Sequence, residues 1–163
     1  MLFRSVAAGV SAAGVPVAVA APLAVAVPEG APWAGEDAQI NCAPNALVLF
    51  NPILDTSKKG FGFDRFPSPE LAKQANLMGA IRKDLPPMII FHGTTDRVVP
   101  IESSEVFTKK MTRKKNAITL LPYEGQGHGF FNLNVSFDFY QSTLNAISRE
   151  VWSVARLIAL NNL

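Results

Sequence analysis

The chain has 163 residues, of which 48% are hydrophobic and 17% are charged, so it suits one domain with a core and is too poor in charge for a disordered chain. Fifteen Lys and Arg against thirteen Asp and Glu leave a formal net charge of +2, too weak a bias to indicate a nucleic-acid partner. A single cysteine, Cys42, excludes an intrachain disulfide and a cysteine-based zinc site, and two histidines exclude most histidine-rich metal sites. We therefore expect one domain over residues 1–163, with no metal and no cofactor.

The stretch of residues 5–27 has no charged side chain and allows two interpretations. In the first, residues 1–26 are a secretory signal peptide that starts with Arg4 and is cleaved after Ala-Val-Ala, and the protein is secreted or periplasmic. In the second, the stretch is a buried strand, a sharp turn at Ser11 and a helix of small residues, and the protein is cytoplasmic. Prolines at positions 16 and 22 count against an uninterrupted transmembrane helix, so no stable membrane span is expected.

Beyond this stretch the chain alternates between loops, apolar runs and helical patterns. Prolines and glycines are frequent in residues 28–45 and 55–69, which predicts loops. Continuous apolar runs of strand length are typical of strands buried on both faces of a parallel sheet, and they occupy residues 46–50, 88–91 and 117–121. Helical patterns cover residues 70–82, 101–115 and 136–160. The alternating order predicts an α/β domain with a parallel sheet.

The helix expected over residues 101–115 is amphipathic. Val106 and Met111 are expected to face the core. Basic residues gather near its end, where they suit the helix dipole: Lys109, Lys110, Arg113, Lys114 and Lys115. We interpret them as a solvated helix end rather than as a site for an anionic partner.

Polar residues follow each of the predicted strands. Functional side chains of open parallel sheets lie just past the carboxyl ends of the strands. The residues at these positions are Ser11, then Asn51 and Asp55, then His92 and Asp96, and finally His128. The chain order of serine, aspartate and histidine is the order found in α/β hydrolases.

Ser11, Asp96 and His128 also fit together chemically. A serine hydroxyl is a weak nucleophile until a base takes its proton, and His128 has a glycine on each side that leaves a substrate room to approach. Asp96 would hold the imidazole in one tautomer and stabilise the imidazolium. A strand–turn–helix elbow would lift Ser11 above the sheet and aim the backbone N–H of Ala12 at a developing oxyanion.

Three other residues are of types that could take part in the same chemistry. Asp55 is the second choice for the acid, because it follows the strand before the one that Asp96 follows. His92 comes directly after a strand, so we expect it to pack or to hydrogen-bond locally. Cys42 lies in a predicted loop with no evident base near it, so a catalytic thiol is not expected.

Three segments carry a resemblance to a known family: PNALVLFNPILDTS, PPMIIFHGTTDRVVPIESSEVF and YEGQGHGFFN. They resemble the second half of bacterial α/β-hydrolase esterases, in particular the acetyl-esterase and feruloyl-esterase-like, lipase-like serine hydrolases. The resemblance covers about residues 5–160 and is strongest over residues 44–132. The two motifs HGTxDxxVP and GxGHGFFN are specific when they occur together.

The resemblance implies a role for each candidate residue. Asp96 matches the triad acid of the family and His128 matches its triad base. The segment GVSAAG stands where the family has a nucleophile motif similar to G-G-S-A-G-G, so Ser11 is the implied nucleophile and the elbow is favoured over the signal peptide. The segment departs from this motif at positions 10 and 13, which hold valine and alanine where glycines are usual.

The resemblance also sets expectations for the fold. The first half of such a fold supplies several strands and an HGGG-type loop with further oxyanion N–H groups, and this sequence contains no HGGG. The expected architecture is a partial α/β-hydrolase fold, a mostly parallel sheet of about four strands flanked by helices, with the first half of the fold missing. An exposed sheet edge would favour a homo-oligomer.

The implied function is that of a serine carboxylesterase that hydrolyses short acyl esters, such as acetyl esters of sugars, through an acyl-enzyme. Its substrate would be a small-molecule or carbohydrate ester. The alternative is a catalytically inactive or very weak hydrolase fragment that acts as a binding or assembly module, or that needs a second chain.

Overall fold

Four parallel strands form one sheet in the computed structural model, which describes residues 6–10 and 46–160. The strands are β1 (Val6–Val10), β2 (Ala46–Phe50), β3 (Met88–Gly93) and β4 (Ile118–Tyr123), and they lie side by side in chain order. All three pairings are parallel. The predicted α/β class with a parallel sheet is therefore confirmed.

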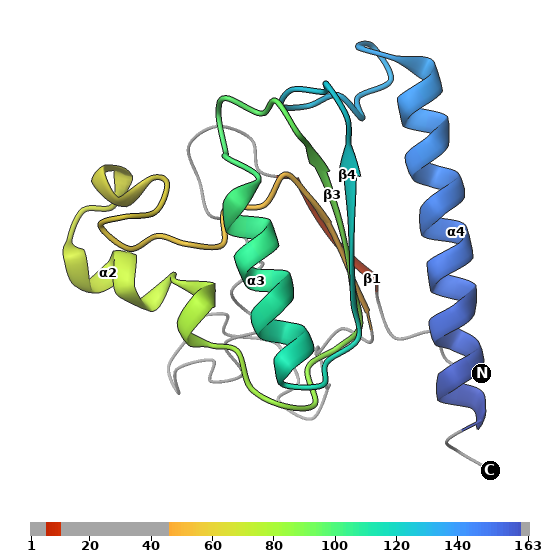
Figure 1. Ribbon diagram of the computed structural model, residues 1–163, viewed down its shortest axis with the longest axis horizontal. Helices are drawn as coiled ribbons and strands as arrows, with labels where there is room; N and C mark the ends of the chain where they lie inside the picture. Colours follow the sequence, from red (N-terminus) through yellow and green to blue (C-terminus); the bar gives the residue numbers. More distant parts are fainter. Residues whose placement is uncertain (1–5, 11–45, 161–163) are drawn as a thin grey trace, which may run out of the picture.

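Three helices accompany the sheet (Figure 1): α2 (Pro69–Gln74), α3 (Glu102–Arg113) and α4 (Phe137–Leu160). Short 3-10 turns, η1 (Phe63–Arg65) and η2 (Leu77–Gly79), flank α2. Helices α3 and α4 cover opposite faces of the sheet. The segments from β2 to β3 and from β3 to β4 return the chain to the start of the next strand, as parallel strands require.

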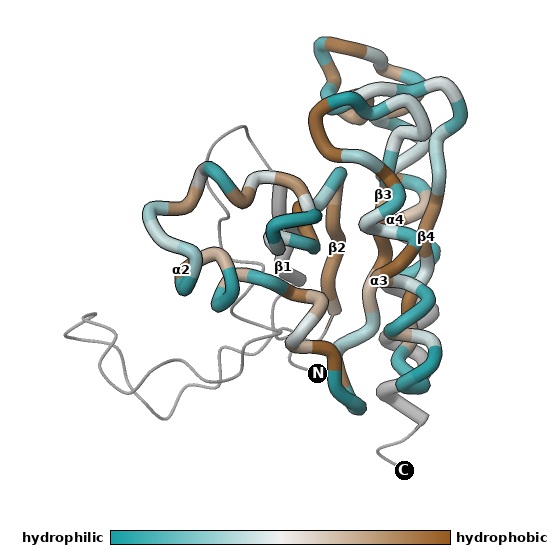
Figure 2. The backbone as a smooth tube through the Cα atoms, turned by 60° about the vertical axis from the view of Figure 1, so that its left-hand side comes forward, coloured by the Kyte–Doolittle hydropathy of each residue, from teal (hydrophilic) through white to brown (hydrophobic). Residues whose placement is uncertain are grey.

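β2 and β3 are buried on both faces of the sheet, and their successive side chains point to opposite sides. The core beneath α3 contains Leu47, Leu49, Met88 and Ile90 together with Phe107 and Met111. The core beneath α4 contains Val48, Phe50, Ile89 and Phe91 together with Ala146. Figure 2 shows hydrophobic colouring along β2, β3 and β4, whereas α3 is mostly hydrophilic in colour. Burial on both faces explains why β2 and β3 are continuous apolar runs rather than alternating ones.

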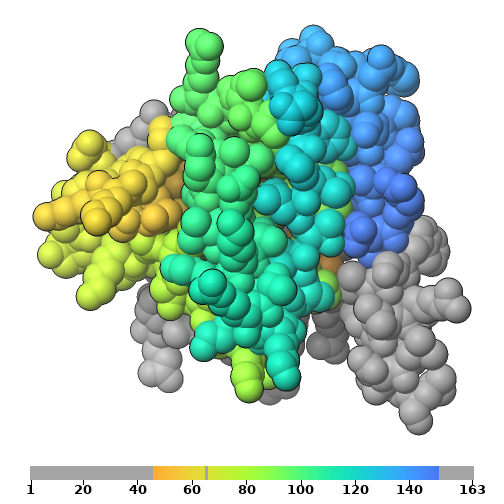
Figure 3. All heavy atoms as spheres, viewed as in Figure 1, coloured from red at the N-terminus to blue at the C-terminus, as the bar shows by residue number. Residues whose placement is uncertain are grey.

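The register of the strands brings their carboxyl ends to one edge. Val10 is paired with Phe50, Phe50 with Phe91, and Phe91 with Leu121. The loops that follow β3 and β4 meet at this edge, at the top of Figure 1, and they form the upper rim of the molecule in Figure 3. The residues that directly follow these strands therefore start from one edge of the sheet.

Two local predictions were wrong. The helix expected over residues 70–82 ends at Gln74, because Asn76 adopts an extended backbone and its side chain accepts a hydrogen bond from the Met78 N–H at 2.9 Å. In α3, Met111 is fully buried as predicted, but Val106 is 46% exposed. Phe107 takes the core position instead, since it lies four residues before Met111 on the same helix face.

Candidate active site

Asp96 and His128 lie together at the carboxyl edge of the sheet. Asp96 follows β3 and His128 follows β4, and the His128 Nδ1 lies 2.8 Å from the Asp96 Oδ2. The Asp96 side chain is fully buried, while 22% of the His128 side chain is exposed. The structure thus brings together two of the three residues that the sequence singled out, and their catalytic roles stay predictions.

The loop around Asp96 holds its carboxylate from both sides. Its Oδ1 accepts hydrogen bonds from the backbone N–H groups of Val98 at 2.8 Å and Val99 at 2.9 Å. Its Oδ2 accepts hydrogen bonds from His128 and from the side-chain amide of Asn51. Four donors therefore point at one buried carboxylate, which fixes its orientation.

These donors also set the charge of Asp96. Burial by itself would raise the pKa of this carboxyl group, because it disfavours the charged form. The hydrogen bonds from Val99, His128, Asn51 and Val98 outweigh burial, so the pKa lies below its ordinary value of 3.8. Asp96 is consequently an anion at neutral pH, and an ionised carboxylate can only accept hydrogen bonds.

The tautomer of His128 follows from its partner. Because the Asp96 carboxylate accepts, the His128 Nδ1 carries the proton of this 2.8 Å contact, and we assign the tautomer on that basis. The basic lone pair then lies on Nε2, on the opposite side of the ring from Asp96. A histidine in this state can take a proton from a hydroxyl group that approaches Nε2.

Aromatic packing anchors the segment that carries His128. Phe130 and Phe131 are 2% and 8% exposed, and both belong to the core beneath α4. The Phe131 ring lies 4.4 Å from the Phe50 ring, and the Phe130 ring lies 4.5 Å from the Tyr123 ring. The pair of phenylalanines in the sequence GHGFF thus ties the histidine loop to the ends of β2 and β4.

Backbone contacts join the loop of Asp96 to the loop of His128. The Thr94 N–H donates to the Tyr123 carbonyl at 3.0 Å, and the Thr95 N–H donates to the Gln126 carbonyl at 3.0 Å. A Cβ atom added to Gly93 would lie 2.2 Å from the Gln126 carbonyl oxygen. The two loops approach so closely that only glycine fits at the end of β3.

His92 plays the local role predicted for it. Its side chain is fully buried, with Nδ1 2.8 Å from the Ser104 hydroxyl and Nε2 2.8 Å from the Val99 carbonyl. Since a carbonyl only accepts, Nε2 donates and the ring is neutral when Ser104 donates to Nδ1. Burial lowers the pKa of His92, which keeps it neutral over a wider pH range.

Of the remaining candidates, Asp55 lies among the described residues and the others do not. Asp55 forms a turn of its own: its Oδ1 accepts from the Ser57 N–H at 2.9 Å and from the Asn76 side chain at 3.0 Å. Ser11, Ala12 and Cys42 lie outside the described residues, as does the stretch for which a signal peptide was weighed. In sequence, Ser11 directly follows the last residue of β1.

Asn51 is the residue of this site to which the sequence analysis gave no role. It follows β2, is 1% exposed, and its side-chain Nδ2 donates to the Asp96 Oδ2 and lies 3.5 Å from the His128 Nδ1. The available signal was its position directly after a buried strand. That position alone does not reveal that it reaches the carboxylate of the neighbouring strand.

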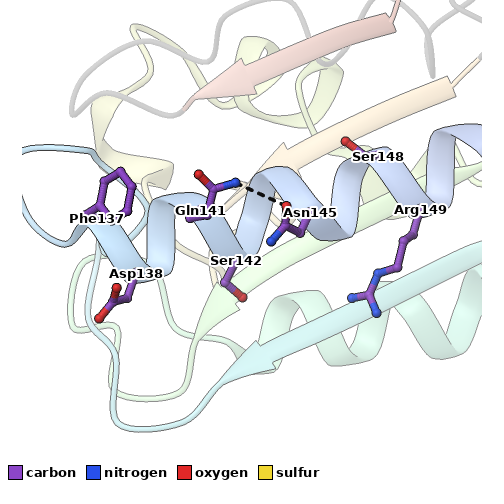
Figure 4. A pocket seen from close by; sticks show the side chains of 7 residues that line it. All are labelled: Phe137, Asp138, Gln141, Ser142, Asn145, Ser148 and Arg149. Carbon is purple, nitrogen blue, oxygen red and sulfur yellow. Dashed lines mark hydrogen bonds between the residues drawn. The ribbon is translucent and has the colours of Figure 1, made fainter.

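The described residues include neither a cluster of metal ligands nor a membrane-spanning helix, and they form a groove away from Asp96 and His128. Within residues 46–160, no three His, Cys, Asp or Glu residues are grouped so that they could hold a metal ion. None of the helices described is long and apolar enough to cross a membrane. An open groove of about 610 Å³ runs along α4 between Phe137 and Arg149, and its lining includes neither Asp96 nor His128 (Figure 4). All of its lining residues belong to α4.

Comparisons with known proteins find similarity to esterases. The BD-FAE family model matches residues 53–111. A probable isoprenylcysteine alpha-carbonyl methylesterase, ICMEL1 from Arabidopsis thaliana, is 38% identical over 61 residues, which are 37% of this chain and 13% of that protein. The chain is similar to the α/β-hydrolase esterase family over part of its length. The matches cover part of the family's fold.

Solved structures extend the likeness over the α/β-hydrolase fold. The propionate-bound esterase Est2 of Thermogutta terrifontis is 36% identical, with a TM-score of 0.66 over 77% of this chain and 47% of that one. Esterase 2 of the same organism phosphonylated by sarin is 34% identical, with a TM-score of 0.65 over 74% of this chain and 48% of that one. This chain therefore spans less than half the length of these esterases.

Proposed function

We propose that this chain hydrolyses carboxylic esters of small molecules by serine-esterase chemistry. The observation that carries the proposal is the contact of 2.8 Å between His128 and the buried carboxylate of Asp96. An oriented imidazole whose Nε2 can accept a proton is the base that a serine nucleophile needs. Ser11 is the proposed nucleophile, because it is the residue that follows β1 and β1 ends at the edge where this pair lies.

The proposed reaction has two halves. Ser11 Oγ attacks the ester carbonyl carbon while its proton moves to the His128 Nε2, and the backbone N–H of Ala12 stabilises the oxyanion. The alcohol then leaves with the proton from Nε2, and an acyl-enzyme on Ser11 remains. A water molecule attacks the acyl group in the second half, gives its proton to Nε2, and releases the acid when Ser11 takes that proton back.

The proposed substrates are short acyl esters, including acetyl esters of sugars. The propionate found in a structural relative of 36% identity is a short carboxylate, which is the kind of product that such a reaction releases. The contacts that select the alcohol belong to loops, which vary most between members of one fold. The class of the acyl group is therefore the better supported part of this proposal.

A second candidate is an inactive or very weak hydrolase unit that works by association. β1 is the outermost strand of the sheet among the described residues, and an unpaired strand edge can pair with another chain. The sequence contains no HGGG loop to supply further oxyanion N–H groups, and losing one such donor costs on the order of 10²–10³ in rate. This candidate predicts a homodimer or a second chain at the β1 edge, and slow hydrolysis at most.

The deciding experiment is the intact mass of the full chain before and after reaction with a fluorophosphonate probe. A relative that is phosphonylated by sarin supports this choice of probe. We expect one adduct that maps to Ser11, that Ser11→Ala abolishes and that His128→Asn slows. Ser148→Ala, which changes an exposed serine of α4, is the matched control and should leave labelling unchanged.

The outcomes separate the two candidates. Labelling at Ser11 together with hydrolysis of p-nitrophenyl acetate supports the esterase. A folded chain that takes no adduct refutes it, and the size of the unlabelled protein in solution then shows whether it forms an oligomer. An adduct on another serine would refute the role of Ser11 alone.

A further inference from the structure

Asn51 is locked at the end of β2 by its own backbone. Its N–H donates to the Phe91 carbonyl at 2.9 Å, so it is tied to the neighbouring strand β3. Its φ is 44°, in the left-handed region that asparagine tolerates better than most residues. Its side chain therefore starts from a fixed point, 1% exposed, between the ends of two strands.

The amide of Asn51 is aimed at the acid of the pair. Nδ2 donates to the Asp96 Oδ2, the same oxygen that accepts from the His128 Nδ1 at 2.8 Å. The reversed amide would set a carbonyl oxygen against the carboxylate, so this orientation is the one that the charges favour. The carboxylate oxygen that holds the histidine is thus itself held from a second side.

The oxygen of the Asn51 amide makes no hydrogen bond within the part of the chain that the structure describes. The Asn51 Oδ1 is buried and has no hydrogen-bond partner among the described residues. A buried polar atom without a partner is costly, and a residue kept for packing alone would avoid it. The donor end of the side chain accounts for an asparagine here.

We propose that Asn51 is a positioning residue, which fixes the Asp96 carboxylate so that His128 keeps its proton on Nδ1 and its lone pair on Nε2. The expected effect on ester turnover rests on the proposed function. The expected effect on the orientation of Asp96 and His128 rests on the geometry alone. Asn51 acts through Asp96, and its removal should change the turnover of an ester more than the binding of that ester. The groups that face the Asn51 amide are Asp96 and His128, with the His92 Nε2 3.5 Å from the same carboxylate oxygen.

Two variants of the full chain test the proposal. Asn51→Gly removes the donor without strain at a positive φ, and Asn51→Asp keeps the size of the side chain and replaces the donor by a carboxyl group. The matched control is Asn76→Ala, which removes another asparagine that donates to an aspartate, at 3.0 Å from the Asp55 Oδ1 and away from the pair. Asn51→Asp keeps the test decisive if Asn51→Gly does not fold.

The first measurement is NMR of the chain with ¹⁵N-labelled histidine. Only two imidazoles are present, and His128→Asn assigns their signals. We expect a downfield signal of the His128 Nδ1–H in the unaltered chain and in Asn76→Ala, and its broadening or loss in both Asn51 variants. An unchanged signal in both Asn51 variants would overturn the proposal, whether or not the chain is active.

The second measurement is steady-state kinetics with p-nitrophenyl acetate. We expect kcat to fall about 10- to 100-fold in both Asn51 variants with KM unchanged, because the lost hydrogen bond is to a charged group. Asn76→Ala should change kcat less than about 3-fold, within the range of a remote substitution. A kcat in both Asn51 variants equal to that of Asn76→Ala would refute the positioning role. An unaltered chain that shows the NMR signal and no activity would refute the proposed function alone.

Discussion

Gly93→Ala is the substitution that tests most directly how the two loops of the site are joined. Gly93 ends β3, three residues before Asp96, and it is buried. The added Cβ would lie 2.2 Å from the Gln126 carbonyl oxygen, 2.7 Å from the Gln126 carbonyl carbon and 2.8 Å from the Gly127 carbonyl oxygen. All three atoms are backbone of the loop that carries His128, so no side chain can rotate away to make room.

The size of the effect follows from these distances. Ordinary van der Waals contact begins at 3.4 Å, so the Gln126 carbonyl must retreat by about 1 Å. That movement breaks the 3.0 Å hydrogen bond from the Thr95 N–H. Overpacking costs about 1–3 kcal/mol and the lost hydrogen bond about 1 kcal/mol, so we expect Gly93→Ala to lower the free energy of unfolding by about 2–4 kcal/mol. A displacement of His128 by about 1 Å would reduce esterase turnover by about 10²-fold.

Urea unfolding and the His128 Nδ1–H signal are the assays, with Gly127→Ala as the control. A Cβ at Gly127 meets nothing within 4 Å, and this glycine lies in the same loop as Gln126. The control should change the free energy of unfolding by less than about 0.5 kcal/mol. Equal stability of the two variants, within that margin, would show that the close approach of β3 to the histidine loop does not constrain the fold, and the argument would fail.

Three further substitutions probe the site and its support. Asp96→Asn sets a side-chain amide against the donors around it, and we expect kcat to fall about 10⁴-fold with a stability loss of about 1–3 kcal/mol; a normal kcat would refute the role of the carboxylate. Because burial lowers the pKa of His92, stability should fall as the pH drops below the ordinary value of 6.5, and His92→Gln should flatten this part of the pH profile measured by urea unfolding. Phe91→Ala, at a fully buried ring, should cost about 3–5 kcal/mol, whereas Phe137→Ala, at a ring 63% exposed, should cost less than about 0.5 kcal/mol; equal costs would contradict the assigned core.

The positions that could be predicted from the sequence were those whose neighbouring residues allow few structural environments. A histidine with a glycine on each side and two phenylalanines after it is poorly suited to a core. In the structure, 22% of the His128 side chain is exposed, and Phe130 and Phe131 are buried in the core. His92 lies in β3 and Asp96 follows it by four residues. The local hydrogen bonds predicted for His92 are present, and the role of Asp96 as the triad acid stays a prediction. The role of Ser11 stays a prediction, since it lies outside the described residues.

What the sequence left open depended on contacts between segments far apart in the chain. Val106 and Phe107 are both apolar residues of α3, and the face that the helix turns toward the sheet decided that Phe107 is buried and Val106 exposed. Asn51 could be placed after a strand, but its partner Asp96 lies 45 residues away, and no local pattern encodes that distance.

The sequence by itself determined the class of the fold, the parallel sheet and the likeness to esterases, because apolar runs, the order of the elements along the chain and compact motifs can be read from local sequence. The tertiary structure decided which donors surround Asp96, why Gly93 admits no larger residue, and where the first helical pattern breaks. These features arise where adjacent strands end at one edge in a common register, so that hydrogen bonds and steric limits act between residues that the sequence keeps apart.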